Sequence, residues 1–261
     1  MNHEKTLQQL RSQAVKEFLS LNHPHFLGSE ALVYIPVFNE EHTIAKVVEG
    51  VRRFCNFDVI VVEDGSTDAT LSILQHLGVE VLSHPTPMSS WNILSALEVG
   101  HALGYKYIIK IDGDDQQDPR DIPRLYSHAI QTGADTVIGS RHLERFSAKI
   151  WSVEGSGMWF CSKLLYLLSG RRITDTTSGF KLWNRRSAQV IIQAFNEGKL
   201  KDVTTFLVEE LLITTKRNLR IEEINVAMYP RQYGESKCYA SKKKLAMFPF
   251  NLVRSTFRAF L

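Results

Sequence analysis

Residues 57–68 read Phe-Asp-Val-Ile-Val-Val-Glu-Asp-Gly-Ser-Thr-Asp, a short apolar run that leads into an acidic turn. The run 57–62 predicts a β-strand, and the spacing of apolar residues over 68–77 predicts a helix behind it. Similar apolar runs predict strands at 31–37, 79–82, 107–111 and 136–138. Short apolar strands that alternate with helices are typical of a parallel sheet covered on both faces. We therefore expect an α/β, Rossmann-like fold with a mostly parallel central sheet flanked by helices.

Acidic residues directly follow three of the predicted strands. The three clusters are Asn39-Glu40-Glu41, Glu63-Asp64 and Asp112-Gly113-Asp114. In open α/β sheets, ligands bind outside the carboxyl ends of the strands. Carboxylates gathered there without matching bases repel one another, so a divalent cation or a hydroxyl-rich ligand is the expected occupant. The alternative is that the acids are helix N-caps, as Asp68 could be.

The segment Asp112-Gly113-Asp114 suits a metal that carries phosphates. Residues i and i+2 of an extended segment point to the same side, so Asp112 and Asp114 can face one cation. Gly113 lets the backbone bend and a ligand approach closely. Hard oxygen ligands favour Mg²⁺ or Mn²⁺, which also bind substrate phosphates. The sequence contains no P-loop, no G-x-G-x-x-G after the first strand, no H-E-x-x-H and no G-x-S-x-G.

The net charge of +3 over 261 residues conceals an uneven distribution. Residues 1–235 carry a net charge of −3 and the last 26 residues carry +6. This distribution argues against a nucleic-acid-binding protein, whose basic residues would cover a folded face. Three cysteines without a C-x-x-C pair indicate a reducing compartment. With neither an apolar run long enough to span a bilayer nor an N-terminal signal, we expect a cytoplasmic location.

Apolar residues in both terminal regions are spaced as in amphipathic helices. One such helix is expected at 4–21, within an N-terminal extension 1–30. In the tail 238–261, Phe250, Val253 and Phe257 fall on one helical face, and a lysine run precedes them. Basic residues beside aromatic ones are typical of a helix that lies on a membrane surface. The alternative is that the aromatic face of the tail packs on the protein body.

Six short motifs occur in a family-specific order. They are Pro36-Val37-Phe38-Asn39-Glu40, Glu63-Asp64-Gly65-Ser66, Asp112-Gly113-Asp114-Asp115-Gln116, Gly139-Ser140-Arg141, Asp175-Thr176-Thr177-Ser178-Gly179-Phe180 and Arg231 through Gly234 to Ser236-Lys237. Taken together, residues 31–237 resemble the family 2 glycosyltransferases of GT-A fold. The resemblance is closest to the polyprenyl-phosphate sugar transferases typified by dolichol-phosphate mannose synthase. Phe38 stands where this family usually has Tyr, and Thr176 where it has Pro.

The resemblance implies a GT-A glycosyltransferase domain over 31–237 and a role for each matching residue. Pro36, Phe38, Glu40, Asp64 and Asp112 would bind the nucleotide-sugar. Asp112, Asp114 and Gln116 would hold Mg²⁺ or Mn²⁺ on its diphosphate. The catalytic site would comprise Asp112, Asp114, Arg141, Ser178, Arg231 and Lys237, the last four around the reacting diphosphate and a polyprenyl phosphate acceptor. Arginine and lysine suit phosphate oxygens.

Two other functions are compatible with the same motifs. One is transfer to a glycan or small-molecule hydroxyl, which requires a general base; Glu209 or Glu210 could serve, although nothing in the sequence distinguishes them. The other is a protein that binds nucleotide-sugars without catalysis. The intact Asp112 and Asp114 pair argues against the second.

Overall fold

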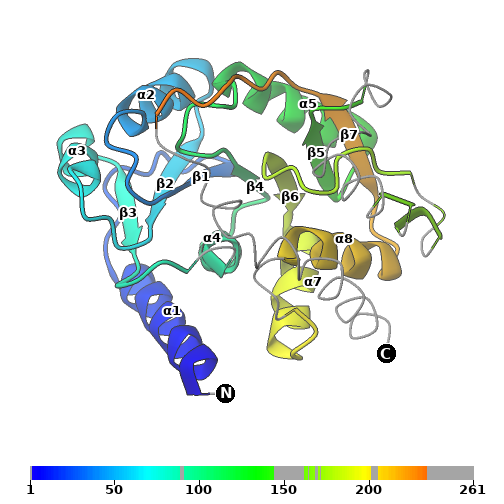
Figure 1. Cartoon of the computed structure of the whole chain (residues 1–261), viewed down its shortest axis with the longest axis horizontal. Helices are drawn as coiled ribbons and strands as arrows, with labels where there is room; N and C mark the ends of the chain where they lie inside the picture. Colours follow the sequence, from blue (N-terminus) through cyan, green and yellow to red (C-terminus); the bar gives the residue numbers. More distant parts are fainter. Residues whose placement is uncertain are drawn as a thin grey trace.

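The structure is a computed structural model that describes residues 2–88, 91–143, 162–163, 165–167, 170, 172–200 and 205–233. A seven-stranded sheet runs through its centre with helices on both faces (Figure 1). The strand order is β3-β2-β1-β4-β6-β5-β7. The strands are β1 (Ala31–Val37), β2 (Asp58–Glu63), β3 (Glu80–Ser83), β4 (Tyr107–Lys110), β5 (Thr136–Ser140), β6 (Lys181–Asn184) and β7 (Ile221–Asn225).

The sheet is mostly parallel, as the sequence predicts. Its exception is β6, which runs antiparallel to both of its neighbours, β4 and β5. Strand β6 was not predicted from the sequence. This strand is only four residues long and begins with a lysine, so it lacks the apolar run that marks the other strands. The strand ends of β1, β2 and β4, where the acidic clusters were expected, lie side by side because these strands are neighbours in the sheet.

The helices form two layers, one on each face of the sheet. Among the described residues these layers contain α1 (Asn2–Ser20), α2 (Ile44–Phe54), α3 (Thr70–Leu77), α4 (Trp91–Ala102), α5 (Ile122–Thr132), α7 (Arg185–Asn196) and α8 (Phe206–Lys216), and a short 3₁₀ turn η1 (Pro119–Asp121) precedes α5. Helices α2, α3 and α5 cover one face, and α1, α4, α7 and α8 cover the other (Figure 1).

Alternation along β1 divides the core between these two layers. Leu32 and Tyr34 point to the α4 side, whereas Val33 and Ile35 point to the α2 side, and all four are fully buried. A strand buried on both faces needs apolar residues at every position, which is why β1 is a continuous apolar run. This core fixes the strand ends that carry the acidic clusters.

Helix α1 packs its apolar stripe on the α4 side of the core. Val15 and Phe18 are buried there. Arg11 donates two hydrogen bonds to Glu98 of α4, at 2.8 and 3.0 Å.

The division of the chain into an extension 1–30, a domain 31–237 and a tail remains a prediction.

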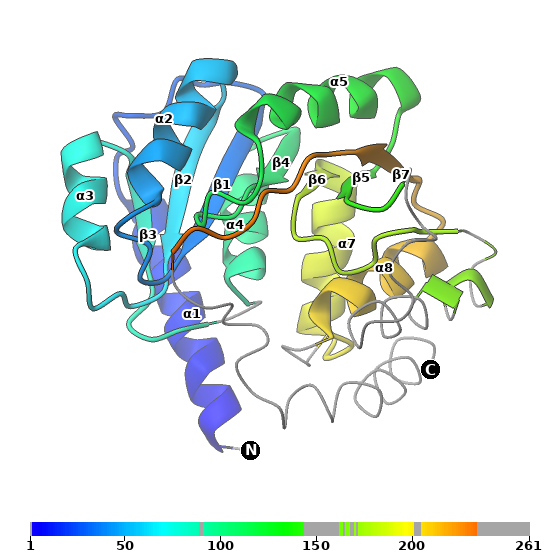
Figure 2. The same cartoon turned by 45° about the horizontal axis from the view of Figure 1, so that its top comes forward.

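After β7 the chain crosses the carboxyl edge of the sheet toward α2 (Figures 1 and 2). We call residues 226–233 the strap. Backbone hydrogen bonds join Val226 to the carbonyl of Ser140 and Tyr229 to the carbonyl of Gln116. The Tyr229 hydroxyl reaches Asp118 at 3.2 Å. The strap therefore passes directly beside the loop that follows β4.

Several sequence predictions fall outside the described residues. These are Lys237 and the whole tail 238–261. Within the described part of the chain, no helix is both long enough and apolar enough to cross a membrane.

Candidate active site

The loops after β1 and β2 are tied to each other. Asn39 adopts a left-handed backbone conformation with φ of 54°, which asparagine tolerates better than most residues. Its amide donates to the Ser66 hydroxyl at 3.0 Å, and its side-chain oxygen accepts from the Thr67 amide at 2.8 Å. The Glu40 amide donates to the Thr70 hydroxyl at 2.9 Å. These bonds hold the two acidic clusters next to each other, as the parallel strand order requires.

Asp64 is buried, and other side chains fix its carboxylate. His84 Nδ1 lies 2.7 Å from one carboxylate oxygen, and Asn92 donates to the other at 3.1 Å. His84 Nε2 lies 3.0 Å from the hydroxyl of Ser95 in α4. No sequence pattern indicates His84, Asn92 or Ser95, because they follow β3 or lie in α4, far from Asp64 in the sequence. The predicted role of Asp64 in nucleoside binding remains a prediction.

Gly113 allows the loop after β4 to approach β1. A Cβ atom at this position would lie 2.7 Å from Cγ1 of Val37 and 3.2 Å from the carbonyl oxygen of Pro36. The Gly113 carbonyl also accepts a hydrogen bond from the Thr43 hydroxyl at 2.7 Å. The glycine therefore brings Asp112 and Asp114 against the end of β1, where Pro36 and Phe38 are half-buried.

Asp112 lies close enough to Asp114 to raise its pKa. Burial and the neighbouring Asp112 carboxylate raise the pKa of Asp114 from 3.8 to about 6. Asp112 is held at both of its carboxylate oxygens. Lys110 Nζ contacts one oxygen, and Gln117 donates to the other at 2.6 Å. Lys110 was not among the predicted site residues, although residues i and i+2 share one side of an extended segment.

Arg231 of the strap bridges two acidic clusters. Its Nη1 donates to Asp114 at 2.9 Å and its Nη2 donates to Glu40 at 2.6 Å. The strap thus carries a cation to the carboxylates at the ends of β1 and β4. The resemblance placed Arg231 among the phosphate-binding residues, and this structure places it on the predicted nucleotide-sugar side of that site.

The donor set suits a cation that shares its coordination with a substrate. In the described residues, no group of three or more His, Cys, Asp or Glu side chains could hold a metal by itself. Mg²⁺ typically takes one or two carboxylates and completes its coordination with phosphates and water. Asp112 and Asp114 meet this requirement, and the guanidinium of Arg231 already binds Asp114 as a cation. The predicted ligand Gln116 donates its amide to the carbonyl of Tyr229 at 3.1 Å.

On the other side of β4, the predicted acceptor residues are joined into a second cluster. The Arg141 guanidinium donates two hydrogen bonds to Asp175, at 2.6 and 2.7 Å, and one to Thr177 at 2.9 Å. Burial raises the pKa of Asp175, but hydrogen bonds from Arg141 and its charge outweigh this and hold the pKa below its usual value. The Ser178 hydroxyl donates to the carbonyl of Gly139 at 2.7 Å. Ser178 thus ties two of the motifs together.

Glu209 and Glu210, the two candidates for a general base, are both buried in α8. Glu209 accepts a hydrogen bond from Thr205 at 2.9 Å. Glu210 forms an ion pair with Lys181 at 2.5 Å and accepts from Trp183 at 3.0 Å. Burial raises the pKa of Glu210, and Lys181 opposes that shift. Both carboxylates are therefore engaged by neighbouring side chains.

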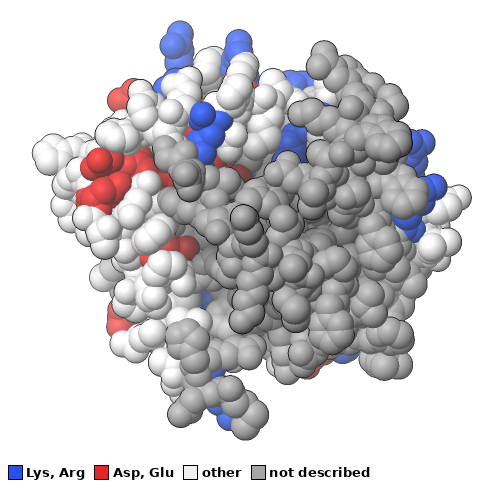
Figure 3. Space-filling view, in the orientation of Figure 1, with Lys and Arg blue, Asp and Glu red and all other residues white. Residues whose placement is uncertain are grey.

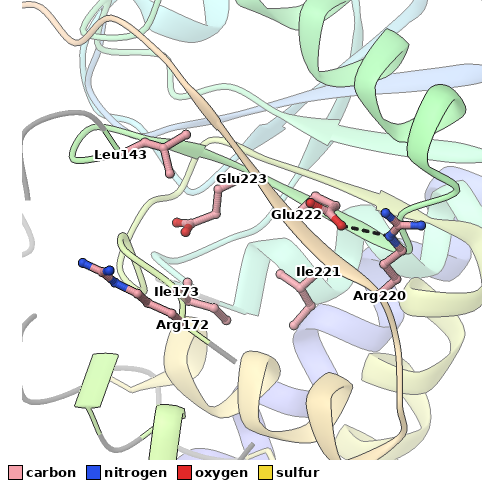
Figure 4. Close-up of a pocket in the computed structure, with 7 residues that line it drawn as sticks. All are labelled: Leu143, Arg172, Ile173, Arg220, Ile221, Glu222 and Glu223. Carbon is pink, nitrogen blue, oxygen red and sulfur yellow. Dashed lines mark hydrogen bonds and ion pairs between the residues drawn. The ribbon is translucent and has the colours of Figure 1, made fainter. Parts of the chain in front are cut away.

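A separate open cavity of about 560 Å³ lies beside β7 (Figure 4). It is lined by Leu143, Arg172, Ile173, Arg220, Ile221, Glu222 and Glu223. Strands β6 and β5 separate β7 from β4, so this cavity does not contain the carboxylates described above. On the face shown in Figure 3, acidic side chains instead gather on the side of α2 and α3.

Comparisons with known proteins agree with this architecture. The model of glycosyl transferase family 2 matches residues 32–192, more than half of the chain. Over 227 residues the chain is 26% identical to the polyprenol monophosphomannose synthase of Mycolicibacterium smegmatis, covering 83% of this chain and 84% of that protein. It is 24% identical over 230 residues to the UDP-N-acetylglucosamine–dolichyl-phosphate N-acetylglucosaminyltransferase of Methanococcus voltae, covering 80% and 90%.

The solved structures show the same fold. A crystal structure of glucosyl-3-phosphoglycerate synthase from Mycobacterium tuberculosis, in complex with Mn²⁺, UDP and glucosyl-3-phosphoglycerate, superposes with a TM-score of 0.64. The two sequences are 18% identical, and the match covers 93% of this chain and 84% of that one. The expectation of a GT-A fold is confirmed. The chain belongs to glycosyl transferase family 2 and is a glycosyltransferase.

Proposed function

We propose that this glycosyltransferase moves a sugar from a UDP- or GDP-sugar to a polyprenyl phosphate, with Mg²⁺ or Mn²⁺ and with inversion at the anomeric carbon. The observation that carries the proposal is the carboxylate pair after β4, where Arg231 already binds Asp114 as a cation. The names of two relatives, which specify polyprenol and dolichyl phosphate chemistry, support the acceptor. Membership of the family removes the non-catalytic alternative.

On the donor side, Asp112 and Asp114 would hold the cation, with Gln116 beside them. The cation, when bound, would neutralise negative charge that develops on the leaving nucleoside diphosphate. The nucleoside would lie against the ends of β1 and β2, where Pro36, Phe38, Glu40 and Asp64 are gathered. The Phe38 ring offers an apolar face for stacking, and carboxylates accept hydrogen bonds from the N–H groups of a base or the hydroxyls of a ribose.

Arg141, Ser178, Arg231 and Lys237 would surround the two phosphate groups that meet at the reacting carbon, with Arg231 on the donor side of them. A phosphate monoester is ionised near neutral pH, so its oxygen can attack without a general base. The arginines would hold that oxygen in line with the anomeric carbon, which is catalysis by positioning and by electrostatic stabilisation. A single in-line displacement inverts the configuration of that carbon.

The state of α8 favours a phosphate acceptor over a hydroxyl acceptor. A hydroxyl nucleophile needs a base with an available lone pair near the reacting carbon. Glu210 is buried, paired with Lys181 and hydrogen-bonded to Trp183. Glu209 is fully buried and accepts a hydrogen bond from Thr205.

A lipid acceptor also gives the basic tail 238–261 a role, because a membrane-surface helix would bring the site to its substrate. Sedimentation of the protein with anionic liposomes at low salt tests this role.

The proposal is tested by measuring nucleotide release with UDP-, GDP- and dTDP-sugars in the presence of Mg²⁺ or Mn²⁺. Three parallel reactions contain undecaprenyl phosphate, undecaprenol or no acceptor. We expect release to depend on undecaprenyl phosphate. Equal release with undecaprenol would favour a hydroxyl acceptor, and equal release without any acceptor would contradict transfer to lipid.

Two neighbouring carboxylates provide a matched pair of variants. Asp114→Asn removes a proposed cation ligand and should lower the turnover rate by about 100-fold or more, the order expected when a main electrostatic contact is lost. Asp115→Asn changes the adjacent carboxylate, which pairs with the exposed Lys46 on the surface. Its activity should remain within about threefold of wild type, because its partner Lys46 is 69% exposed and ion pairs that reach the solvent contribute little.

A further inference from the structure

Lys110 is a buried lysine directly beneath the proposed donor site. It is the last residue of β4 and is 7% exposed. Its ammonium contacts a carboxylate oxygen of Asp112, two residues further along. A buried ammonium group is costly unless it is paired. The family motifs quoted above do not include this position, and the chemistry of the proposed reaction does not by itself require a lysine there.

A second buried lysine limits where the Lys110 ammonium can go. Lys110 and Lys181 are directly opposite in the antiparallel pair of β4 and β6, so their side chains lie on the same face of the sheet. Lys181 is fully buried and already has Glu210 as its partner. Like charges in opposite positions repel each other. Repulsion from Lys181 therefore directs the Lys110 ammonium toward Asp112.

The backbone of the segment before β6 closes over this pair. A Cβ atom on Gly179 would lie 2.5 Å from Lys110 Nζ and 3.1 Å from Oδ2 of Asp112. The other side of the Asp112 carboxylate is held by Gln117, which donates from its side chain and accepts from the Asp112 amide. The carboxylate is therefore fixed at both oxygens by groups that lie beneath the site. Its side chain is still 30% exposed, which leaves lone pairs available to a ligand.

We propose that Lys110 is a positioning residue, which holds the Asp112 carboxylate in the orientation that receives the nucleoside diphosphate of the donor. Without it, repulsion from the nearby Asp114 would turn the Asp112 carboxylate away from the position in which both face one ligand. With it, the pair of carboxylates carries about one net negative charge less before the donor arrives. This inference rests on the proposed donor chemistry and is independent of the acceptor.

The test is a double-mutant cycle measured by calorimetry with Mn²⁺ and UDP, and with Mn²⁺ and GDP. The proteins are the wild type, Lys110→Met, Asp112→Asn and the double variant. We expect Lys110→Met to weaken binding of whichever nucleotide the wild type binds by about tenfold, the equivalent of about 1.4 kcal/mol. In the Asp112→Asn background the same change should cost less than about threefold, because the two residues act as one unit. Lys106→Met, which alters an exposed lysine just before β4, is the control and should bind as wild type.

Gly179→Ala provides a second route to the same interaction. The added methyl group would displace the Lys110 ammonium from Asp112 while both charges remain, so it should weaken nucleotide binding in the same direction. Thermal unfolding shows whether each variant is folded. If Lys110→Met does not fold, nucleotide binding by Gly179→Ala tests the role of Lys110 instead. Binding by Lys110→Met within twofold of wild type would overturn the proposal. So would a loss that persists in full when Asp112 is already asparagine.

The result separates this inference from the proposed function. If the variants show the coupled loss of nucleotide binding but the wild type does not modify polyprenyl phosphate, the proposed acceptor is contradicted and the role of Lys110 is supported. If the wild type modifies polyprenyl phosphate but the variants show no coupling, the proposed acceptor is supported and the role of Lys110 is contradicted. A wild-type protein that binds neither nucleotide would overturn both the donor chemistry and the role of Lys110.

Discussion

Arg231→Gln is the substitution that most directly probes the carboxylate site. In the structure, the guanidinium must leave Asp114 before a cation can bind this carboxylate fully. The contact is 2.9 Å long, and both side chains are 16% exposed. Two unit charges about 4 Å apart interact by about 4 kcal/mol at an effective dielectric constant of about 20. A cation that binds Asp114 competes against this attraction.

Only part of that attraction opposes cation binding. The displaced guanidinium can keep its contact with Glu40, at 2.6 Å, and it regains water. If about one third of the attraction is lost on displacement, the competition amounts to about 1.4 kcal/mol, which is tenfold in a dissociation constant. We therefore expect Arg231→Gln to bind Mn²⁺ about tenfold more tightly than the wild type when no nucleotide is present.

The assay is a Mn²⁺ titration followed by calorimetry or by the paramagnetic resonance of free Mn²⁺. Arg124→Gln serves as the control, since Arg124 pairs with Asp121 at the start of α5 and its side chain is 56% exposed. Hydrogen exchange gives an independent readout. The Tyr229 amide, which bonds to the Gln116 carbonyl, should exchange faster in Arg231→Gln because the strap has lost an anchor. Equal or weaker Mn²⁺ binding by Arg231→Gln would refute the reasoning.

Three further predictions follow from buried groups. The pKa of Asp114 is raised from 3.8 to about 6, so between these pH values the Asp114 carboxyl loses its proton in the unfolded chain but keeps it in the folded one. The free energy of unfolding of the metal-free protein should therefore fall as pH rises from 4 to 7, by at most about 3 kcal/mol. Urea unfolding of Asp114→Asn should show a smaller fall over the same pH range. Lys181→Met should cost about 3–5 kcal/mol of unfolding free energy by leaving Glu210 unpaired, and adding Glu210→Leu should restore most of it. Gly113→Ala should weaken nucleotide binding by tenfold or more in the same calorimetric assay, because its methyl group would collide with Val37.

The sequence was sufficient to predict the strands that carry the site. Apolar runs mark β1, β2 and β4, and each leads into an acidic turn, so the convergence of Glu40, Asp64 and Asp112 follows from the parallel order alone. Asp68, considered as a helix cap, lies one residue before Ala69, the N-cap of α3, and accepts a hydrogen bond from the Thr70 amide at 3.0 Å. These features depend on residues close together in the chain.

The features that escaped prediction depend on residues far apart. Strand β6 begins with Lys181, whose charge is compatible with burial only because Glu210, 29 residues later, pairs with it. Arg231 lies 191 residues from Glu40, and no local pattern indicates that the strap returns to the loop that follows β1. Alternation along the strand could have placed Lys110 on the same side as Asp112, but its proposed role depends on Lys181 in the neighbouring strand β6.

The central claim, sugar transfer from a nucleotide to a polyprenyl phosphate, is tested most directly by identifying the product. The wild-type protein is incubated with Mn²⁺, undecaprenyl phosphate and a nucleotide-sugar that supports nucleotide release, and the organic extract is analysed by mass spectrometry and ³¹P NMR. We predict a new lipid whose mass equals that of undecaprenyl phosphate plus one sugar residue, which is one sugar less one water, and whose phosphorus is a diester to the inverted anomeric carbon. Sugar found only as the free hydrolysis product, or bound through a hydroxyl oxygen with the lipid phosphate left as a monoester, would contradict the account.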